Sequence, residues 1–327
     1  MAVPWTERQR DAARRNAGFA AFDVAREERR CHELGAALVV RGDPDYPDLL
    51  ASIYDPPLVL YVQGRLTGAH PVAVVGTRAP SMYGRRMARS LAGDAARAGL
   101  TIVSGLARGI DSEAHLAALE AGAPTWAVMG TGLARVYPAE NLGLARRIVA
   151  EGGAVISERP LDTPPTRDAF PRRNRIVSGL SWATVVVEGR HQSGAMITAR
   201  CAAEQGRSVL AVPCPADSVL AEAPNTLLRD GAGPAIDLKD ILGALPDGHL
   251  LQARKLPPQK ASPALPPTEE EAKILALLGS DALSLDELVQ LSGLDTTLIS
   301  SIMFGLELKE RVFFVPGQRY AQKEACR

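Results

Sequence analysis

The first thing that the chain lacks is an excess of charge of either sign, because 37 Lys and Arg residues balance 37 Asp and Glu residues. A protein that coats nucleic acid non-specifically needs a broad positive excess, so any nucleic-acid binding here must come from a focused patch. Aromatic side chains are scarce too, at 5% of the residues. An aromatic residue beside a basic cluster is therefore informative in this sequence.

Cysteine patterns and long apolar runs are also missing. The four cysteines are scattered, without a CxxC pair or a nearby histidine pattern, which argues against a disulfide framework or a zinc site and favours a reducing compartment. Residues 1–30 are rich in Arg and Glu and lack the apolar core of a signal peptide. No stretch approaches the roughly 20 apolar residues of a membrane span. We therefore expect a cytoplasmic protein without membrane contact.

Several motifs of nucleotide and hydrolase chemistry are absent as well. The sequence contains neither the P-loop pattern GxxxxGK[ST] nor the nucleophile elbow GxSxG, and Gly130-x-Gly132 lacks the third glycine of a dinucleotide site. Asp111 and His115, four residues apart, could form an acid–base or metal pair, although such a pair more often caps a helix and buries its histidine. No cofactor and no metal ion are predicted.

Short apolar runs, glycine-rich turns and helical patterns alternate from residue 72 to residue 212. The runs are rich in β-branched residues and occupy 72–75, 101–103, 125–129, 154–156, 183–187 and 208–212. Continuously apolar strands that alternate with helices are typical of a parallel sheet buried on both faces. The sequence therefore predicts an α/β fold of Rossmann-like type with a doubly wound, mostly parallel sheet.

Changes in composition divide the chain into four parts. A short N-terminal helical segment, 1–40, leads into the Rossmann-like domain, 41–242. Six prolines then mark a linker at 243–267. Residues 268–327 read as three short helices and a β-hairpin around Pro316-Gly317, which is the plan of a winged helix.

The third helix of the predicted winged helix runs from Asp295 to about Glu310. A helix that reads duplex DNA needs basic and amide side chains, and this one has no Lys or Arg in its first three turns. This composition favours protein contact or self-association over duplex binding.

The segment that begins at Phe170 concentrates the positive charge of the chain. Arg172, Arg173, Asn174 and Arg175 follow this aromatic residue, and the stretch 159–175 holds five Arg against two Asp. Guanidinium groups suit phosphate, and an aromatic face suits a base, so the pattern favours a site for single-stranded nucleic acid. A solvated basic helix start paired with acidic neighbours is the alternative.

Glycine-rich turns at the carboxyl ends of the predicted strands complete the predicted site. Ligands collect at this edge of an open parallel sheet, and the N–H groups of a helix start suit phosphate. Any one of these glycines could serve only a tight turn, but their joint pattern predicts an amide-lined shelf beside Phe170. The candidates in these turns are Gly76, Thr77, Arg78, Ser81, Ser104, Gly105, Arg108, Ser193, Gly194 and Thr198.

In order and spacing, these motifs resemble the DNA processing protein A family (DprA, also called Smf). The resemblance covers about residues 40–240, and the tail from Glu270 to Tyr320 is similar to the winged-helix domain of that family. The segments that carry it are Val75-Gly-Thr-Arg78, Ser104-Gly-Leu-Ala-Arg-Gly-Ile-Asp111, Tyr137-Pro138, Ser157-Glu158, Phe170-Pro-Arg-Arg-Asn-Arg-Ile176, Ser178-Gly-Leu-Ser181, Val186-Val-Glu188, Ser193-Gly194, Ile197-Thr-Ala199 and Ala211-Val-Pro213.

The resemblance implies a non-enzymatic homodimer that binds single-stranded DNA, protects incoming strands during natural transformation and loads the recombinase RecA onto them. It also implies a DNA pocket made by Arg78, Arg167 and the stretch 170–175, with Phe170 stacking a base and Ser193-Gly194 contributing amides and hydroxyls.

The chain departs from the family pattern at three places. Gln192 stands where the family usually has Lys or Arg, Cys214 stands where it has glycine, and 221–225 replaces a more glycine-rich segment. These departures concern the far side of the implied pocket.

Two other functions remain open from the residues alone. The amide shelf could hold a mononucleotide in a nucleotide or nucleoside-phosphate hydrolase, with Glu158 or Glu188 as the base. Those carboxylates could equally anchor arginines or turn amides. The chain could also be an adaptor whose winged helix recruits partners. The family resemblance favours the DNA-binding protein.

Overall fold

The computed structural model describes residues 4–18, 22–246, 268–278, 283–308, 311–315 and 319–322. Contacts divide the chain into two compact units, Met1–Leu256 and Pro257–Arg327, and each unit is described by itself. Most of the predicted linker and the predicted turn at Pro316-Gly317 lie outside the described residues.

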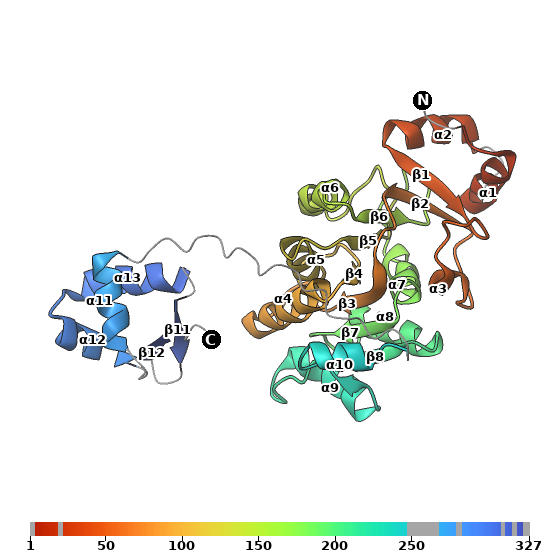
Figure 1. The fold of residues 1–327 in the computed structure, drawn as a ribbon. Helices are drawn as coiled ribbons and strands as arrows, with labels where there is room; N and C mark the ends of the chain where they lie inside the picture. The colour runs from red at the N-terminus through yellow and green to blue at the C-terminus, as the bar shows by residue number, and fades with distance from the viewer. Residues whose placement is uncertain are drawn as a thin grey trace. The chain divides into compact units, whose positions relative to one another are not determined.

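The described part of the first unit is built on a nine-stranded sheet (Figure 1) with the order β1-β2-β6-β5-β4-β3-β7-β8-β9. The neighbours from β6 to β9 are parallel, whereas β1 with β2 and β2 with β6 are antiparallel. The predicted fold class is confirmed. The strands are β1 (Ala36–Val40), β2 (Val59–Gly64), β3 (Ala69–Val75), β4 (Leu100–Ser104), β5 (Thr125–Met129), β6 (Ala154–Ser157), β7 (Ala183–Val186), β8 (Ser208–Ala211) and β9 (Gly233–Pro234).

The strand order reverses between β3 and β7. The chain builds the sheet outward from β3 through β4 and β5 to β6, then returns to place β7 on the other side of β3. The connections that leave β3 and β7 therefore diverge, which opens a crevice at the carboxyl ends of these two strands.

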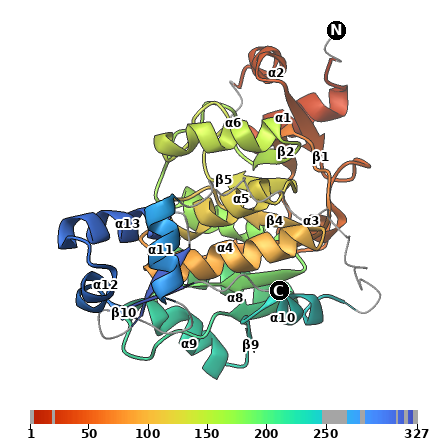
Figure 2. The same cartoon turned by 60° about the vertical axis from the view of Figure 1, so that its left-hand side comes forward.

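Helices cover both faces of this sheet (Figures 1 and 2). Val72 and Val74 of β3 pack toward α4 and α5, whereas Ala73 and Val75 pack toward α7 and α8. Both sides of β3 are thus buried, which explains why its sequence is continuously apolar. The helices of this layer arrangement are α4 (Met82–Arg97), α5 (Ile110–Glu120), α6 (Leu142–Ala150), α7 (Ala169–Gly179), α8 (Gly194–Glu204), α9 (Glu222–Arg229) and α10 (Leu238–Gly243), with short 3-10 helices at Ala139–Asn141 and Val219–Ala221.

The N-terminal residues are tied to the sheet rather than appended to it. Helices α1 (Glu7–Ala17) and α2 (Val24–Glu33) precede β1, and a short α3 (Asp48–Ala51) precedes β2. The carboxylate of Glu27 in α2 accepts a hydrogen bond of 2.7 Å from the Leu161 N–H, beyond the end of β6. The pairing of β1 with β2 makes Ala36–Val40, the end of the predicted N-terminal segment, part of the same sheet.

The second unit is a winged helix, as predicted. A three-stranded sheet with the order β10-β12-β11 packs with three helices around buried side chains such as Ile274, Leu288 and Leu306. Ser284 caps its helix in a capping box with Glu287. The elements are α11 (Glu269–Leu278), β10 (Leu283–Ser284), α12 (Leu285–Ser292), α13 (Thr296–Leu308), β11 (Val312–Val315) and β12 (Arg319–Gln322). Across the described residues, no helix has the length and apolar character that crossing a bilayer requires.

Candidate nucleic-acid interface

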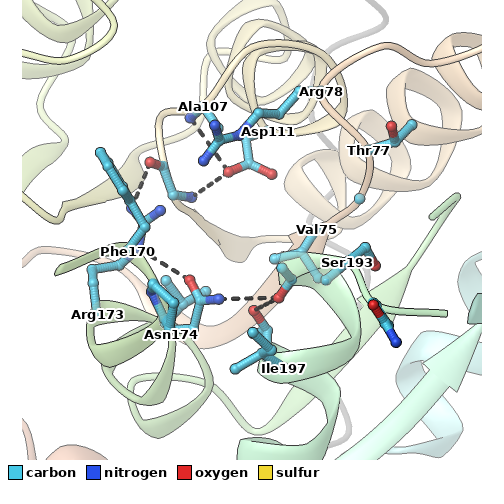
Figure 3. A pocket seen from close by; sticks show the side chains of 18 of the residues that line it. Val75, Thr77, Arg78, Ala107, Asp111, Phe170, Arg173, Asn174, Ser193 and Ile197 are labelled. Atoms are coloured by element: carbon cyan, nitrogen blue, oxygen red, sulfur yellow. Dashed lines mark hydrogen bonds between the residues drawn. The ribbon is translucent and has the colours of Figure 1, made fainter. Parts of the chain in front are cut away.

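A pocket of about 670 Å³, called the central pocket below, opens at the reversal of strand order. Its lining comes from the turns after β3 and β4, the first turns of α7, and the segment between β7 and α8 (Figure 3). Segments that are far apart in the sequence therefore meet where an open α/β sheet places its ligands.

The turn after β3 is held by backbone hydrogen bonds, and the Ile110 side chain leaves no room for a side chain at Gly76. A Cβ atom there would lie 2.5 Å from Ile110 Cγ1. The Thr77 N–H donates to the Glu188 carbonyl at 2.7 Å, and the Ile110 N–H donates to the Thr77 carbonyl at 3.2 Å. The turn is thus fixed at both ends, and Arg78 extends from it into solvent at the pocket.

Glu188 anchors the start of α4. Its buried carboxylate accepts hydrogen bonds from the Ser81 N–H at 2.9 Å and from the Ser81 hydroxyl at 2.5 Å. Ser81 in turn caps α4 by accepting a bond from the Gly84 N–H. Glu158 holds the Arg175 guanidinium at 2.7 Å. Both carboxylates thus anchor other groups, a turn amide and an arginine, which is one of the two interpretations drawn from the sequence.

A cation and two rings meet at the mouth of the central pocket. The Arg78 guanidinium carbon lies 5.5 Å from the centroid of the Phe170 ring, and the Tyr137 ring centroid lies 5.4 Å from the same ring at an angle of 43°. Phe170 is half-buried and Tyr137 is 38% exposed. Aromatic faces that solvent can reach, next to a guanidinium group, suit a nucleobase joined to a phosphate.

Arg173 forms the floor of the pocket. Its guanidinium is buried and donates to the Gly105 carbonyl at 2.5 Å and to the Val128 carbonyl. Burial lowers the pKa of this group to about 10, although the Asp111 carboxylate opposes the shift. Arg173 therefore supports the pocket from below while Arg78 stands at its mouth.

Asp111 closes the loop that follows β4. Its carboxylate accepts from the Gly105 N–H at 3.1 Å and from the Ala107 N–H at 3.3 Å, and burial raises its pKa. A Cβ atom on Gly105 would come within 2.7 Å of both Arg173 and Asp111, so glycine is needed between them.

His115 is a buried structural residue. Its Nδ1 lies 2.8 Å from the Thr125 hydroxyl, which itself donates to the Ile102 carbonyl, so Nδ1 carries the proton. Burial lowers the pKa of His115 to about 3. Among the described residues, no cluster of His, Cys, Asp and Glu could hold a metal ion. The histidine is buried, as the second interpretation of this pair held, but Asp111 does not cap α5. The N-cap Gly109 has no side-chain cap, and the Asp111 carboxylate binds N–H groups of the preceding loop.

Most of the predicted site residues come together. Arg108 lines a small adjoining pocket with Phe170 and pairs with Glu140 at 3.4 Å. The predicted residues that line the central pocket are Gly76, Thr77, Arg78, Gly105, Arg167, Phe170, Arg173, Asn174, Ser193, Gly194 and Thr198.

Five predicted residues lie outside the central pocket, and one of them is Arg108 in the adjoining pocket. Ser81 is engaged with Glu188, and the buried Ser104 hydroxyl donates to the Val74 carbonyl at 2.7 Å. Arg172 and Arg175 project from another face of α7 into a separate cavity. The arginines that follow Phe170 in the sequence therefore lie on different faces of α7, although all carry the same charge.

Sequence reasoning missed two side chains that line the pocket. Tyr137 was noted only as part of a turn motif, and Arg190 was not considered although it follows the turn after β7 at the same edge. Arg190 is exposed and lies two residues before Gln192, which also lines the pocket. It supplies a cation near the position where the family pattern has one.

The charges around the central pocket are unequal. The lining holds four arginines and a single carboxylate, that of the buried Asp111. Arg78, Arg167 and Arg190 are exposed, and within the described ranges none of them has a carboxylate partner. Although the whole chain is neutral, this edge of the sheet presents unpaired positive charge.

A doubly wound α/β unit with a basic, aromatic pocket at the reversal of strand order, in a chain that also has a winged helix, defines a class of protein suited to anionic ligands. A model of the family "DNA recombination-mediator protein A" matches residues 37–246, and a model of the DprA winged helix domain matches residues 258–318. The chain belongs to the DprA/Smf family.

Individual members of this family are similar to the chain over most of its length. Protein Smf of Escherichia coli is 40% identical over 288 residues, covering 86% of this chain and 76% of that protein. DNA processing protein DprA of Bacillus subtilis is 41% identical over 221 residues, covering 67% and 74%.

Two solved structures resemble the fold and differ in their coverage. The X-ray structure of DprA from Streptococcus pneumoniae has a TM-score of 0.63 at 35% identity and covers 69% of this chain and 79% of that one. DprA from Helicobacter pylori has a TM-score of 0.57 at 27% identity and covers 64% and 94%. The H. pylori protein is described as having a unique single-stranded DNA binding mode.

Proposed function

We propose that this protein binds single-stranded DNA in the central pocket. The observation that carries the proposal is the pairing of the Arg78 guanidinium with the ring of Phe170, 5.5 Å apart, at a pocket rim that also presents the unpaired Arg167 and Arg190. The single-stranded DNA binding described for the related H. pylori protein supports the same assignment.

The chemistry divides between phosphate and base. Arg78, Arg167 and Arg190 attract phosphates, and the exposed Gly194, which has no side chain, lets the DNA backbone approach the protein backbone closely. Phe170 and Tyr137 offer faces on which a base can stack, and a base in a duplex has its faces covered by its neighbours. The site therefore favours an unpaired strand, with little dependence on sequence because every base has such a face.

The cellular role that we propose is the one implied by the family. A homodimer in the cytoplasm would protect incoming strands during natural transformation and help load the recombinase RecA onto them. The family description as a DNA recombination mediator supports this role. The proposed activity is binding without turnover, since Glu158 and Glu188 are both engaged by other groups.

The proposal is tested by titrating the full chain with labelled oligo-dT and with a duplex of equal length at several salt concentrations. We expect tighter binding of the single strand, with an affinity that falls as salt rises because phosphate contacts release counterions. Equal affinity for the two forms, or no dependence on salt, would contradict the proposal.

A further inference from the structure

A second group of arginines lies on another face of α7. It surrounds a cavity of about 250 Å³, called the side cavity below, which is lined by Asn16, Asp55, Glu158, Arg159, Arg172 and Arg175. Successive residues of a helix point about 100° apart, so neighbours along α7 serve different cavities. Arg172 faces the side cavity whereas Phe170 and Arg173 face the central pocket. The two cavities therefore lie on different faces of α7.

Both cavities open at the same edge of the sheet. Arg159 follows β6, just as Arg78 follows β3, and these two strands run parallel within the series β6-β5-β4-β3. The carboxyl ends of parallel strands share one edge. A DNA strand that leaves the central pocket along this edge thus reaches the side cavity after passing the start of α7.

The start of α7 is itself favourable to phosphate. No side chain caps this helix, and the exposed Arg167 precedes it by two residues. The partial positive charge of a helix N-terminus adds to that of the arginine. A DNA strand that passes between the two cavities therefore meets the positive charge of Arg167 and of the helix N-terminus.

Two arginines of the side cavity are free to bind an anion. Arg175 is held between Glu158 at 2.7 Å and Asp55 at 3.0 Å, whereas Arg159 and Arg172 have no ion-pair partner in the described part of the chain. The exposed Asp168 is the opposing charge: a hydrogen bond from Thr166 lowers its pKa most, and Arg172 and Arg159 contribute.

The charge balance around the start of α7 still favours an anion. Arg159, Arg167 and Arg172 stand against Asp168 alone, and Arg175 neutralises one of its own two carboxylates, so the sum stays positive.

An exposed aromatic side chain stands one residue before Asp55. Tyr54 has an exposure of 104%, although aromatic residues are scarce in this chain. A single exposed apolar side chain is common on protein surfaces. Its neighbour Asp55 lines the side cavity and pairs with Arg175, however, so Tyr54 adds an exposed ring next to a residue of that cavity.

We propose that the side cavity is a second subsite for the same DNA strand, in which Arg159 and Arg172 bind a phosphate beyond the nucleotide in the central pocket and Tyr54 stacks on a following base. The inference rests on the proposed function, because the strand must already occupy the central pocket.

Oligonucleotide length separates the two sites. Full-length protein is titrated with oligo-dT of about 4 and about 16 nucleotides, which bracket the single-stranded site sizes of other folds. We expect Arg159→Ala/Arg172→Ala to bind the short oligonucleotide as the wild type does. It should bind the long one roughly threefold to tenfold more weakly, with a log–log salt slope lower by about 1.4, which is about 0.7 for each of two lost contacts.

The matched control removes the same charge from the opposite edge of the sheet. Arg65 follows β2 where β6 begins, and Arg97 ends α4 just before β4, so Arg65→Ala/Arg97→Ala changes the net charge equally but leaves the carboxyl edge intact. We expect this variant to match the wild type at both lengths.

Tyr54 gives an independent test of the subsite. Tyr54→Ala should weaken the long oligonucleotide about fivefold or more, and Tyr54→Trp should retain the affinity because a ring remains for stacking.

The outcomes distinguish the two proposals. If the wild type binds the oligonucleotides and Arg159→Ala/Arg172→Ala binds the long one equally well, or loses both lengths in equal measure, the second subsite is wrong while the central pocket stands. If the wild type binds neither length, the proposed function fails and the second subsite fails with it.

Discussion

Arg78 lies over the ring of Phe170, with its guanidinium carbon 5.5 Å from the ring centroid. The two residues are far apart in the sequence and come from the turn after β3 and the first turn of α7. A base that enters the pocket must stack on the ring while its phosphate meets the cation. Each residue can thus be tested by itself, because Phe170 acts by stacking on a base and Arg78 acts through its charge on a phosphate.

Phe170→Ala should weaken single-stranded DNA binding by about 1–3 kcal/mol, since a stacked base loses its platform. Phe170→Tyr keeps an aromatic face and should stay near the wild type. Fluorescence anisotropy with labelled oligo-dT measures both variants. Equal affinity of all three proteins would mean that no base stacks on residue 170.

Arg173→Ala should lower the free energy of unfolding by about 3 kcal/mol, because it leaves the Gly105 and Val128 carbonyls without their donor and Asp111 without a nearby cation. The control is its neighbour: Arg172→Ala, which removes an exposed side chain, should change stability by less than about 0.5 kcal/mol. Urea unfolding of both variants measures these changes in the free energy of unfolding. Similar stabilities would show that Arg173 does not support the pocket floor.

His115 should make the protein less stable in acid. Its pKa is lowered from 6.5 to about 3 by burial, so between these values the unfolded chain binds a proton that the folded chain does not. Stability contributed by the neutral imidazole is present above pH 6.5 and falls toward pH 3 by up to about 1.4 kcal/mol per pH unit.

The variant His115→Gln isolates this effect. Asp111, whose pKa is raised by burial, titrates in both proteins and cancels in the difference. We expect the variant to show a flatter dependence of unfolding free energy on pH between about 6.5 and 3. Parallel curves for the two proteins would show that His115 titrates normally.

The winged helix should contribute little to DNA binding. Helix α13 has no Lys or Arg between Thr296 and Leu308, so it lacks the donors with which a helix reads a duplex. We expect the fragment 1–256 to bind oligo-dT within about twofold of the full chain, or about 0.4 kcal/mol. Tight, salt-sensitive duplex binding by the fragment 268–327 would contradict this view.

The sheet could be predicted because its strands are buried on both faces and therefore continuously apolar. Val72 and Val74 pack into one core and Ala73 and Val75 into the other, so every residue of this run has to be apolar. The place of β1 in the sheet was not predicted, since a short antiparallel edge strand has no such signature. Its pairing depends on β2, which lies about 20 residues further along the chain.

The site was predicted less completely than the fold. The sequence showed that residues 170–175 are basic, but the packing of α7 decides which arginine is buried and which is exposed. Arg173 ends in the floor of the pocket and Arg172 in the side cavity, although the two are adjacent and identical in type. In the sequence Arg190 is only a single charge after a predicted strand, which is a weak indication of a binding residue. Its place in the central pocket follows from the position of β7 beside β3, which the sequence did not predict.

The salt dependence of oligo-dT binding by Arg78→Ala, compared with that of Arg65→Ala, shows whether the rim of the central pocket binds phosphate. Both variants remove one exposed arginine, but Arg65 follows β2 at the opposite edge of the sheet. We expect Arg78→Ala to bind more weakly at every salt concentration, with a log–log salt slope lower by about 0.7, and Arg65→Ala to keep the wild-type slope. Identical slopes and affinities for the two variants would contradict this expectation.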